Sequence, residues 1–499
     1  MRSLIVDIIK QTFHSLDEPT LHKRLYKSVC NGILDGSLQP ATRLPPSRDL
    51  AGELALSRNT VLRVYEQLQA EGYITTRTSS GTFVTDSVLD NLGNQIAPPD
   101  EDATQDEREI LSDRCQLLLS HASANPRQWG AFIPGVPDVE SFPHRMLTKI
   151  QSRLARQPEP EYLTYDVAGG DHALKHALVD YLRTARGVNC STHQVLITEG
   201  VHQALDLIIR SLCNPGDCAW TEEPGYWGIK NILRMNDVES VPVPVDEQGM
   251  QPPEQMDKIP KLIFVTPSHQ YPLGPVMSLA RRKQLLALAR KSGSWIVEDD
   301  YDSEFRFAGN PIPSLQGLEA DSPVIYIGTF SKTLYPSLRM GYVILPRRLA
   351  TPLKTAHSEL YRGGHQLMQA ALAEFIAEGM FSAHIRKMRQ LYGRRRACLV
   401  ALIEQNPGPE ALGRCNSNAG LHLTLALPDA ADDEGIASHA SQAGILVRPL
   451  SRYFSGEKKQ KGLLIGFASM PEELMPFYYN KLLSFIPPAF QRPIIKPEA

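Results

Sequence analysis

Lys332 stands at a point in the chain where its side-chain amine can act as a nucleophile. The apolar residues 324–327 predict a buried strand that ends in small hydroxyl residues just before this lysine. At the end of a buried strand the amine loses its water, which lowers its pKa and frees it to attack an aldehyde carbon. Thr329, Ser331 and Arg339 add hydroxyl donors and a cationic fork, the groups that a phosphate monoester needs. The pattern therefore predicts pyridoxal phosphate, with Lys332 as the residue that forms the aldimine.

A second segment, upstream of Lys332, strengthens this prediction. The short apolar run 295–297 ends in a cluster of carboxylates that includes Asp299. Pyridoxal phosphate withdraws electrons only while its ring nitrogen is protonated, which takes a buried carboxylate partner. Open α/β sheets bind ligands at the carboxyl ends of their strands, so Asp299 is the predicted partner and Tyr301 a donor to the ring phenolate. Each segment alone has a plain structural explanation, a strand-end lysine or a helix-capping Asp, and only the pair favours the coenzyme.

From about residue 126 to its end, the chain resembles fold-type-I pyridoxal phosphate enzymes of the aspartate aminotransferase family. Residues 298–305, EDDYDSEF, and 328–333, GTFSKT, resemble the MocR group in particular. These proteins are transcription regulators in which a GntR-type winged helix is fused to an aminotransferase-like domain. The resemblance implies that Tyr226 lies against the pyridine ring. It also implies that Tyr165 reaches the phosphate held by the other subunit of a homodimer.

Further residues of the same pocket are predicted from position or from the resemblance. Gly200 and Val201 open a helix, where free backbone N–H groups suit a phosphate, although Glu199 stands where the family more often has a hydroxyl. His269 and Tyr271 lie in the segment that replaces the family's Asn-Pro-Thr-Gly turn, where a donor to the phenolate would lie, and His269 is predicted as a second donor.

The resemblance also implies an arginine for a ligand carboxylate. Arg452 aligns with it and Arg448 is its rival. Trp227 and Gly228 stand where the γ-aminobutyrate-responsive member of the group has a second arginine, so a ligand with two carboxylates or a γ-amino acid is not expected.

The first part of the chain predicts a different fold. Leu21, Leu25, Val29 and Ile33 recur every four residues and predict a helix that stops near Gly36. Two shorter helices follow, one from about Ser47 to Leu54 with Ser47 as N-cap, and one after Ser57, with Val61, Val64, Tyr65 and Leu68 facing inward. A turn at residues 71–73 leads into a β-hairpin over residues 74–84. This is the order of a winged helix-turn-helix, whose second helix opens in the DNA major groove.

Residues 20–85 resemble the GntR winged helix-turn-helix almost residue by residue: RLPPSR, LSRNTV, AEGY and SGTFV. The resemblance implies that residues at the start of the recognition helix contact phosphates and base edges and that the wing tip approaches the minor groove. The predicted DNA-binding residues are Arg48, Arg58, Asn59, Thr60, Arg63 and Gly81. A small helical bundle that binds protein is the alternative, and the cluster of Arg48, Arg58 and Arg63 argues against it.

The chain is expected to have three parts: a winged helix domain over residues 1–87, an acidic linker over 88–125, and the aminotransferase-like domain over 126–499. The linker is rich in carboxylates and contains Pro98-Pro99. In the last part, apolar runs near residues 196, 219, 263, 296 and 325 predict a mainly parallel α/β sheet. Helices over 367–378 and 385–402, and strands over 444–453 and 462–467, predict a smaller α+β region.

Composition limits the remaining possibilities. With 499 residues, 42% hydrophobic and 21% charged, the chain resembles an ordinary globular protein. Its net charge of −3 requires that any DNA contact come from a local basic patch. Seven scattered cysteines without metal-ligand spacing predict reduced thiols and no metal site, and no apolar run is long enough for a membrane span. We therefore expect a cytoplasmic protein.

Three functions fit this organisation. The first is a regulator that senses pyridoxal phosphate, or an amino compound that forms an aldimine with it, and changes its binding to a double-stranded operator. The second is a working aminotransferase that its DNA-binding domain merely localises. The third is a DNA-binding protein with a vestigial body, which the many retained pocket residues argue against.

Overall fold

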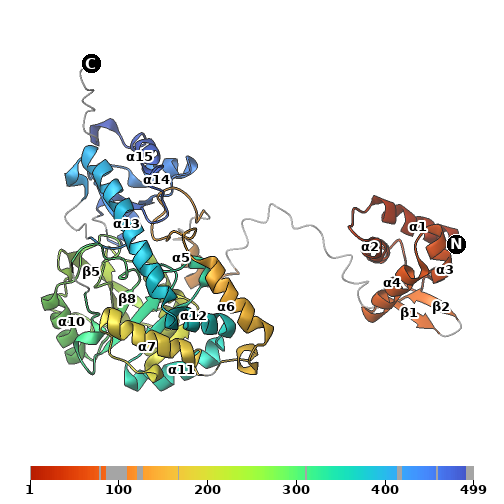
Figure 1. The fold of residues 1–499 in the computed structure, drawn as a ribbon, viewed down its shortest axis with the longest axis horizontal. Helices are drawn as coiled ribbons and strands as arrows, with labels where there is room; N and C mark the ends of the chain where they lie inside the picture. Colours follow the sequence, from red (N-terminus) through yellow and green to blue (C-terminus); the bar gives the residue numbers. More distant parts are fainter. Residues whose placement is uncertain are drawn as a thin grey trace, which may run out of the picture. The chain divides into compact units, whose positions relative to one another are not determined.

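The computed structural model (Figure 1) describes residues 2–77, 80–85, 110–120, 127–166, 168–309, 312–412, 418–456 and 459–490. The chain divides into two units, Met1–Leu111 and Ser112–Ala499. Most of the expected acidic linker lies outside the described residues. Its last part contains helix α5 (Asp113–Ser120), whose Arg114 forms an ion pair with Asp237 of the second unit.

The first unit has the winged helix-turn-helix fold that the sequence predicts. Its elements are α1 (Arg2–Ser15), α2 (Leu21–Leu34), α3 (Ser47–Glu53), α4 (Arg58–Ala70), β1 (Ile74–Arg77) and β2 (Gly81–Val84). The two strands pair antiparallel as the expected wing. Helix α1 was not predicted; its Ile9 and Phe13 are buried in the core of this unit.

Local sequence explains where the short helices begin. Ser57 caps α4, because its hydroxyl accepts a hydrogen bond from the backbone N–H of Thr60. The prediction that Ser47 caps α3 is wrong. Pro46 holds the cap position without a side-chain cap hydrogen bond, its carbonyl oxygen accepts from the N–H groups of Asp49 and Leu50, and Ser47 is the first helical residue.

The large sheet of the second unit is mainly parallel, as expected. Its strands run in the order β3-β10-β9-β8-β7-β4-β5-β6. They are β3 (Val195–Thr198), β4 (Cys218–Glu223), β5 (Glu239–Asp246), β6 (Gly249–Met250), β7 (Leu262–Val265), β8 (Trp295–Asp300), β9 (Val324–Thr329) and β10 (Gly341–Ile344). The five predicted strands are all present. The chain returns through β10, which pairs antiparallel with both β9 and β3.

Both faces of this sheet are buried, which explains its continuous apolar runs. Ala219, Leu262 and Phe264 pack in one hydrophobic cluster, whereas Trp220 and Ile263 beside them pack in another. Successive residues of a strand point to opposite faces, so helices must cover both. The helices are α6 (His144–Arg156), α7 (His172–Arg186), α8 (Val201–Leu212), α9 (Trp227–Met235), α10 (Leu279–Ser292), α11 (Arg347–Tyr361) and α12 (Gln366–Ala377).

Helix α13 (Met380–Gln405) runs from the large sheet to a smaller region (Figure 1). There β11 (His422–Leu427), β13 (Lys461–Gly466) and β12 (Arg448–Pro449) form an antiparallel sheet beside α14 (Asp433–Gln442) and α15 (Met475–Leu483). This is the predicted smaller α+β region, and the helices expected over 367–378 and 385–402 are α12 and part of α13.

The strand expected over residues 444–453 is mostly wrong. Only Arg448–Pro449 pairs with β13, and Leu450–Tyr453 forms a 3₁₀ turn. Pro449 has no N–H for a ladder, and the Asp433 carboxylate accepts both the N–H and the hydroxyl of Ser451. These bonds satisfy the backbone locally and end the strand.

Candidate functional site

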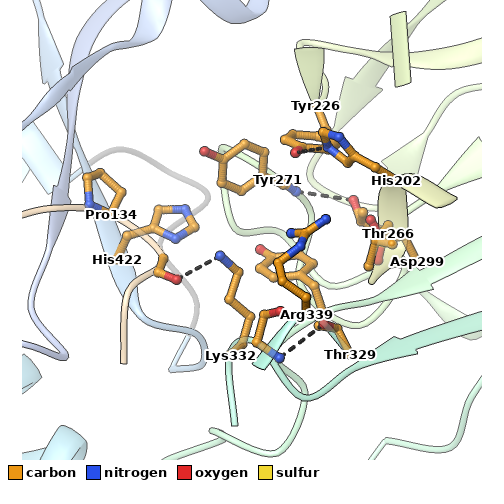
Figure 2. A pocket seen from close by; sticks show the side chains of 14 residues that line it. Pro134, His202, Tyr226, Thr266, Tyr271, Asp299, Thr329, Lys332, Arg339 and His422 are labelled. Atoms are coloured by element: carbon orange, nitrogen blue, oxygen red, sulfur yellow. Dashed lines mark hydrogen bonds between the residues drawn. The ribbon is translucent and has the colours of Figure 1, made fainter. Parts of the chain in front are cut away.

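A cavity in the second unit collects the residues that sequence analysis placed in different segments. It lies where the carboxyl ends of β8 and β9 meet the start of α8 and one edge of the small sheet (Figure 2). Its lining is Pro134, Gly135, Val201, His202, Tyr226, Thr266, Tyr271, Asp299, Tyr301, Thr329, Ser331, Lys332, Arg339 and His422. Of the predicted coenzyme residues, Lys332, Asp299, Tyr301, Tyr226, Val201, Thr329, Ser331 and Arg339 are among them.

The amine of Lys332 points into this cavity from the turn after β9. Its Nζ donates a hydrogen bond to the carbonyl oxygen of Gly135 at 2.7 Å. Burial lowers the pKa of the Lys332 amine, while the carboxylates of Asp302 and Asp299 oppose that change. A lysine with these surroundings releases its proton more easily than an exposed lysine.

Asp299 ends β8 inside the same cavity and is 8% exposed. Among the residues that the structure describes, none forms a hydrogen bond with its Oδ1. Burial, and then the charge of Asp300, raise the pKa of Asp299 to about 7. A buried carboxylate oxygen without a donor is costly, so this atom is suited to a ligand that brings a hydrogen-bond donor.

Asp300, the next residue, faces the opposite side and anchors the strand. It forms a buried ion pair with Arg186, Nε to Oδ2 at 2.8 Å, and accepts a hydrogen bond from the hydroxyl of Tyr326. Arg186 donates in turn to the hydroxyl of Ser268 at 2.6 Å. Two neighbouring carboxylates thus have different surroundings. Oδ2 of Asp300 is bonded to Arg186 and Tyr326, although its Oδ1 has no partner among the described residues, whereas Asp299 lines the cavity.

One end of the cavity is built for an anion. Helix α8 begins there, with Gly200 as N-cap at φ 83° and Val201 as the first helical residue. The guanidinium of Arg339 lies so close to Gly200 that a Cβ there would be 3.3 Å from its Nη2. Thr329 and Ser331 complete this end of the lining. Helix N–H groups, hydroxyls and a guanidinium are groups that can bind a phosphate.

The carboxylate of Glu199, which the sequence made a concern, does not face this end. Its side chain is exposed, and its Oε1 lies 3.8 Å from Nε2 of His365. Only the backbone carbonyl of Glu199 is near Arg339, from which it accepts a hydrogen bond of 3.3 Å.

The walls of the cavity are aromatic and fixed by hydrogen bonds. The Tyr226 hydroxyl and His202 Nε2 are 2.7 Å apart, and the hydroxyls of Tyr271 and Tyr453 are 2.9 Å apart. The Tyr301 hydroxyl lies 2.9 Å from Nδ1 of His269. Flat, rigid side chains in this arrangement suit a planar ligand.

His269 does not line the cavity, although the sequence made it a predicted donor to the coenzyme. Its ring is 3% exposed and lies behind Tyr301. Nδ1 of His269 is 3.0 Å from the Asp302 carboxylate, and Gly420 packs against the ring. The structure therefore gives His269 contact with Tyr301 and not with the cavity.

Several lining residues were not singled out from the sequence. His202 follows Val201 at the start of α8, Thr266 follows β7, and His422 begins β11 in the small sheet. The position of His202, within one turn of a predicted anion-binding helix start, was a usable signal. His422 gave none, because β11 was not predicted.

The two arginines predicted for a ligand carboxylate lie outside the lining. Arg452 is exposed and Arg448 is half-buried. The charge of Arg448 lowers the pKa of both Tyr271 and Tyr453, against the larger rise that burial causes, whereas Arg452 acts on Tyr453 alone.

Tyr165, predicted to serve a partner subunit, does not line this cavity. Its side chain is 73% exposed, and the guanidinium of Arg362 lies 5.3 Å from its ring centroid. Val167, in the same segment, lies outside the described residues.

In the first unit the predicted DNA-binding residues gather on adjoining elements. Arg48 is exposed on α3, and Arg58, Asn59 and Arg63 are exposed on α4, with Thr60 half-buried beside the Ser57 cap. In the part of the chain that the structure describes, Arg48, Arg58 and Arg63 form no ion pair, so their charges are not neutralised internally.

Gly81 opens β2 at the tip of the wing. Its φ of 114° is a value that favours glycine, and a Cβ there would lie 2.8 Å from Nε of Arg43. The predicted tip comprises residues 79–81, of which Ser79 lies outside the described residues.

The described helices include none that is long and apolar enough to cross a membrane. The same residues contain no group of three or more potential metal ligands.

Two family profiles match the chain. The profile of bacterial regulatory proteins of the gntR family matches residues 21–84. The profile of aminotransferase class I and II matches residues 135–476. Both matches fall on the elements described above, the first on the winged helix and the second on the body that contains the cavity.

Individual proteins match over nearly the whole chain. The probable rhizopine catabolism regulatory protein MocR of Rhizobium meliloti is 39% identical over 475 residues, 93% of each chain. The HTH-type pyridoxine biosynthesis transcriptional regulator PdxR of Corynebacterium glutamicum is 30% identical, over 92% of this chain and 94% of its own. Among solved structures, the multiple substrate aminotransferase of Thermococcus profundus matches 76% of this chain and 95% of its own. Its TM-score is 0.64 and its identity 26%.

Proposed function

Since this chain belongs to the MocR group of transcriptional regulators, in which a GntR-family winged helix precedes an aminotransferase class I and II domain, we propose that it binds operator DNA under the control of a coenzyme site. The coenzyme is pyridoxal phosphate. The signal is pyridoxal phosphate itself or a small amino compound that reacts with it. The observation that carries the proposal is the juxtaposition of Lys332, an unpartnered Asp299 oxygen and an anion site in one cavity.

The residues present fit this coenzyme. Asp299 Oδ1 is buried and lacks a donor among the described residues, which is what a protonated ring nitrogen would supply. When bound, pyridoxal phosphate provides an aldehyde that reacts with primary amines and a ring that withdraws electrons. Lys332 would hold the aldehyde end. The phosphate would be held by Arg339, Thr329, Ser331 and the backbone N–H groups of Gly200 and Val201.

The remaining residues orient the ring and exclude water. Tyr226 would lie against a face of the ring, kept in place by His202. Tyr301 would donate to the phenolate oxygen, and His269 with Asp302 would position Tyr301 from behind. His269 is thus proposed as a positioning residue, which changes the role that the sequence suggested.

Burial is the main cause of the pKa shifts of Lys332 and Asp299, the two ionisable residues proposed to hold the ends of the coenzyme. Burial lowers the pKa of the Lys332 amine, so a larger fraction is neutral and nucleophilic near neutral pH. Burial raises the pKa of Asp299 to about 7, and a cationic partner would reverse that change. The two residues therefore prepare the cavity for an aldehyde at one end and a protonated ring nitrogen at the other.

Arg448 and Arg452 are proposed for the carboxylate of an amino-acid effector. Neither lines the cavity, so contact requires the small sheet or the 3₁₀ turn at residues 450–453 to approach the ligand. Arg448 is the more buried of the two, and its charge lowers the pKa of Tyr271, which lines the cavity.

We further propose that the body forms a homodimer through the surface around Tyr165. Leu163 and Tyr165 are 69% and 73% exposed, and a partner subunit would cover these two neighbouring side chains. In such a dimer Tyr165 of one subunit would reach the phosphate site of the other.

DNA binding is assigned to α3, α4 and the wing. Arg48, Arg58, Asn59, Thr60 and Arg63 would contact phosphates and base edges, and Gly81 would approach the minor groove. An effector can change the affinity for DNA only if it binds one state of the protein better than another.

A second function, aminotransferase activity with DNA binding as localisation, is favoured by one observation. The body has the fold of a solved aminotransferase at 26% identity and retains Lys332, Asp299 and Arg339 in one cavity. Steady turnover of an amino donor and a keto acid would favour this function. Single-cycle conversion without turnover would favour sensing.

The coenzyme assignment is tested by absorbance spectra of the full-length chain with pyridoxal phosphate, before and after borohydride. Wild-type protein should show a visible aldimine band that borohydride bleaches, leaving the pyridoxyl group covalently attached, and Lys332→Ala should show neither the band nor the covalent label. Lys354→Ala is the matched control, because burial lowers the pKa of Lys354 to about 8 but it lies outside the cavity. A colourless wild type, or labelling that survives in Lys332→Ala, would refute the assignment.

A further inference from the structure

His422 carries a hydrogen-bond acceptor that the coenzyme roles above do not use. It begins β11, is 3% exposed, and reaches the cavity from the small sheet, opposite the strands that position Lys332 and Asp299 (Figure 2). Its Nε2 lies 3.1 Å from the carbonyl oxygen of Pro272. A carbonyl can only accept, so Nε2 carries the hydrogen and Nδ1 is left with a lone pair.

No described residue forms a hydrogen bond with Nδ1 of His422. The rings of Tyr271 and His422 pack edge-on, with their centroids 5.3 Å apart. Tyr271 presents no donor to His422, because its hydroxyl is paired with that of Tyr453. Lys332, in the same cavity, directs its hydrogen bond to Gly135. The ring centroid of His269 lies 5.3 Å from that of His422, but Nδ1 of His269 is paired with the Asp302 carboxylate.

The imidazole is also fixed in its neutral form. Burial, and then the nearby His269 and Lys332, lower the pKa of His422 to about 3. A base this weak is a poor proton acceptor for an incoming ammonium group, so a role in proton transfer is not favoured. A neutral, immobile acceptor can still take a hydrogen bond from a ligand.

We propose that His422 selects the effector, its Nδ1 accepting a hydrogen bond from an uncharged donor such as a hydroxyl or amide hydrogen on an amine ligand. This deepens the proposed function and rests on it. The same lone pair repels a carboxylate at that point. The preferred class is therefore a small primary amine with a neutral donor facing Nδ1, in preference to an alkyl amine or an amine with a carboxylate at that point. A carboxylate elsewhere on the ligand is still left to Arg448 and Arg452.

The test uses full-length holoprotein and pairs of amines of equal size. Absorbance titrations compare 2-aminoethanol with propylamine and 3-aminopropanol with butylamine, with β-alanine as the carboxylate probe. At one or both lengths the hydroxyl compound should bind about five- to tenfold more tightly, the value of one net hydrogen bond. β-Alanine should bind more weakly than 2-aminoethanol.

Two variants separate recognition from a structural role. His422→Asn keeps an acceptor near the Nδ1 position and loses the donor to Pro272, whereas His422→Gln keeps the donor and loses that acceptor. We expect the hydroxyl preference to survive in His422→Asn and to vanish in His422→Gln. The reverse result, or the same preference in all three proteins, would overturn the inference.

The outcome also distinguishes this inference from the proposed function. If the wild-type chain binds coenzyme and amines but prefers no hydroxyl compound, only the inference fails. If the wild-type chain shows no coenzyme band, the proposed function fails and the inference falls with it.

Discussion

At the scale of single residues, Asp299 links the cavity to the stability of the body. Its folded pKa of about 7 compares with an ordinary value near 3.9, so the folded chain holds the proton more tightly than the unfolded chain. Between about pH 4 and pH 7 the folded state therefore binds more protons, and the stability of the coenzyme-free chain falls as pH rises. Above pH 7 the full cost of the buried carboxylate remains.

Asp299→Asn should remove this pH dependence. Relative to wild type, the coenzyme-free variant should gain on the order of 2–3 kcal/mol between pH 5 and pH 8, because an amide does not ionise. The quantity to compare is the change in the free energy of unfolding between pH 5 and pH 8. The hydrogen-bonding cost of the new amide is the same at both pH values and cancels in this difference. All four tryptophans, at positions 129, 220, 227 and 295, belong to the second unit, so tryptophan fluorescence during thermal unfolding reports on the body alone.

The same substitution should weaken coenzyme binding. Loss of a charged hydrogen bond to the ring nitrogen should cost about 1.5–3 kcal/mol in affinity, roughly ten- to hundredfold. A melting-temperature difference that stays constant from pH 5 to pH 8, together with unchanged affinity for pyridoxal phosphate, would remove Asp299 from the site.

Arg58→Ala tests the proposed DNA-binding surface at Arg58, the first residue of α4. If Arg58 contacts a base edge, the variant should lose about 1–3 kcal/mol of affinity and discriminate less well at one position of the site. The duplex is one selected from a random pool by the full-length chain, and affinity is measured by fluorescence anisotropy. Lys23→Ala is the control of equal charge, because Lys23 is exposed on α2 and is not among the predicted DNA-binding residues. Equal losses in both variants would indicate general charge attraction instead of base contact.

At the scale of elements, the start of α8 unites backbone conformation and anion binding. Gly200 has φ 83° and ψ 179°, a conformation that costs other residues on the order of 1–3 kcal/mol. Gly200→Ala should therefore destabilise the body and also push the added methyl toward Arg339, which lowers the affinity for pyridoxal phosphate at least tenfold.

Gly216→Ala separates these two effects. Gly216 has a similar φ of 87°, but an added Cβ would meet no atom within 4 Å. This variant should lose stability while its coenzyme affinity, from absorbance titration, stays at the wild-type value. If Gly216→Ala loses as much affinity as Gly200→Ala, the effect belongs to general destabilisation and not to the anion site.

The elements that the sequence predicted correctly are those whose residues agree with their environment. Strands β7 and β9 are short apolar runs because both faces are buried, and α4 shows a clean apolar stripe with a capping serine. The strand expected over 444–453 failed because a side chain distant in sequence, Asp433, satisfies the backbone of Ser451. No local pattern records such a contact.

The residues of the candidate site likewise fall into two groups, those that the local sequence predicted correctly and those that it did not. Lys332 and Asp299 follow directly on predicted strands, so their convergence follows from a parallel sheet. His422 reaches the cavity from another sheet, and His269, which sequence placed at the coenzyme, is shielded by Tyr301. Which side chains of a loop face a cavity depends on how two layers pack, and that is not visible in a single segment.

At the scale of the whole molecule, the two proposed activities belong to separate units. The first unit has its own hydrophobic core, and the cavity is lined entirely by residues of the second. The overall charge of −3 repels DNA weakly, so the exposed arginines of α3 and α4 must supply local attraction. Control of one unit by the other therefore requires a free-energy coupling between two distinct sites.

Such a coupling has a quantitative consequence, because linkage between two binding equilibria is reciprocal. If saturating pyridoxal phosphate changes the dissociation constant for the selected duplex by some factor, saturating duplex must change the dissociation constant for pyridoxal phosphate by the same factor. We expect a factor of about 5–150, the usual range of allosteric coupling. Anisotropy measures the first change and absorbance the second. Lys332→Ala should keep the coenzyme-free DNA affinity and lose the response, whereas Lys354→Ala should match wild type. Two tight but independent equilibria, with both factors equal to one, would show that the body does not regulate DNA binding through this site.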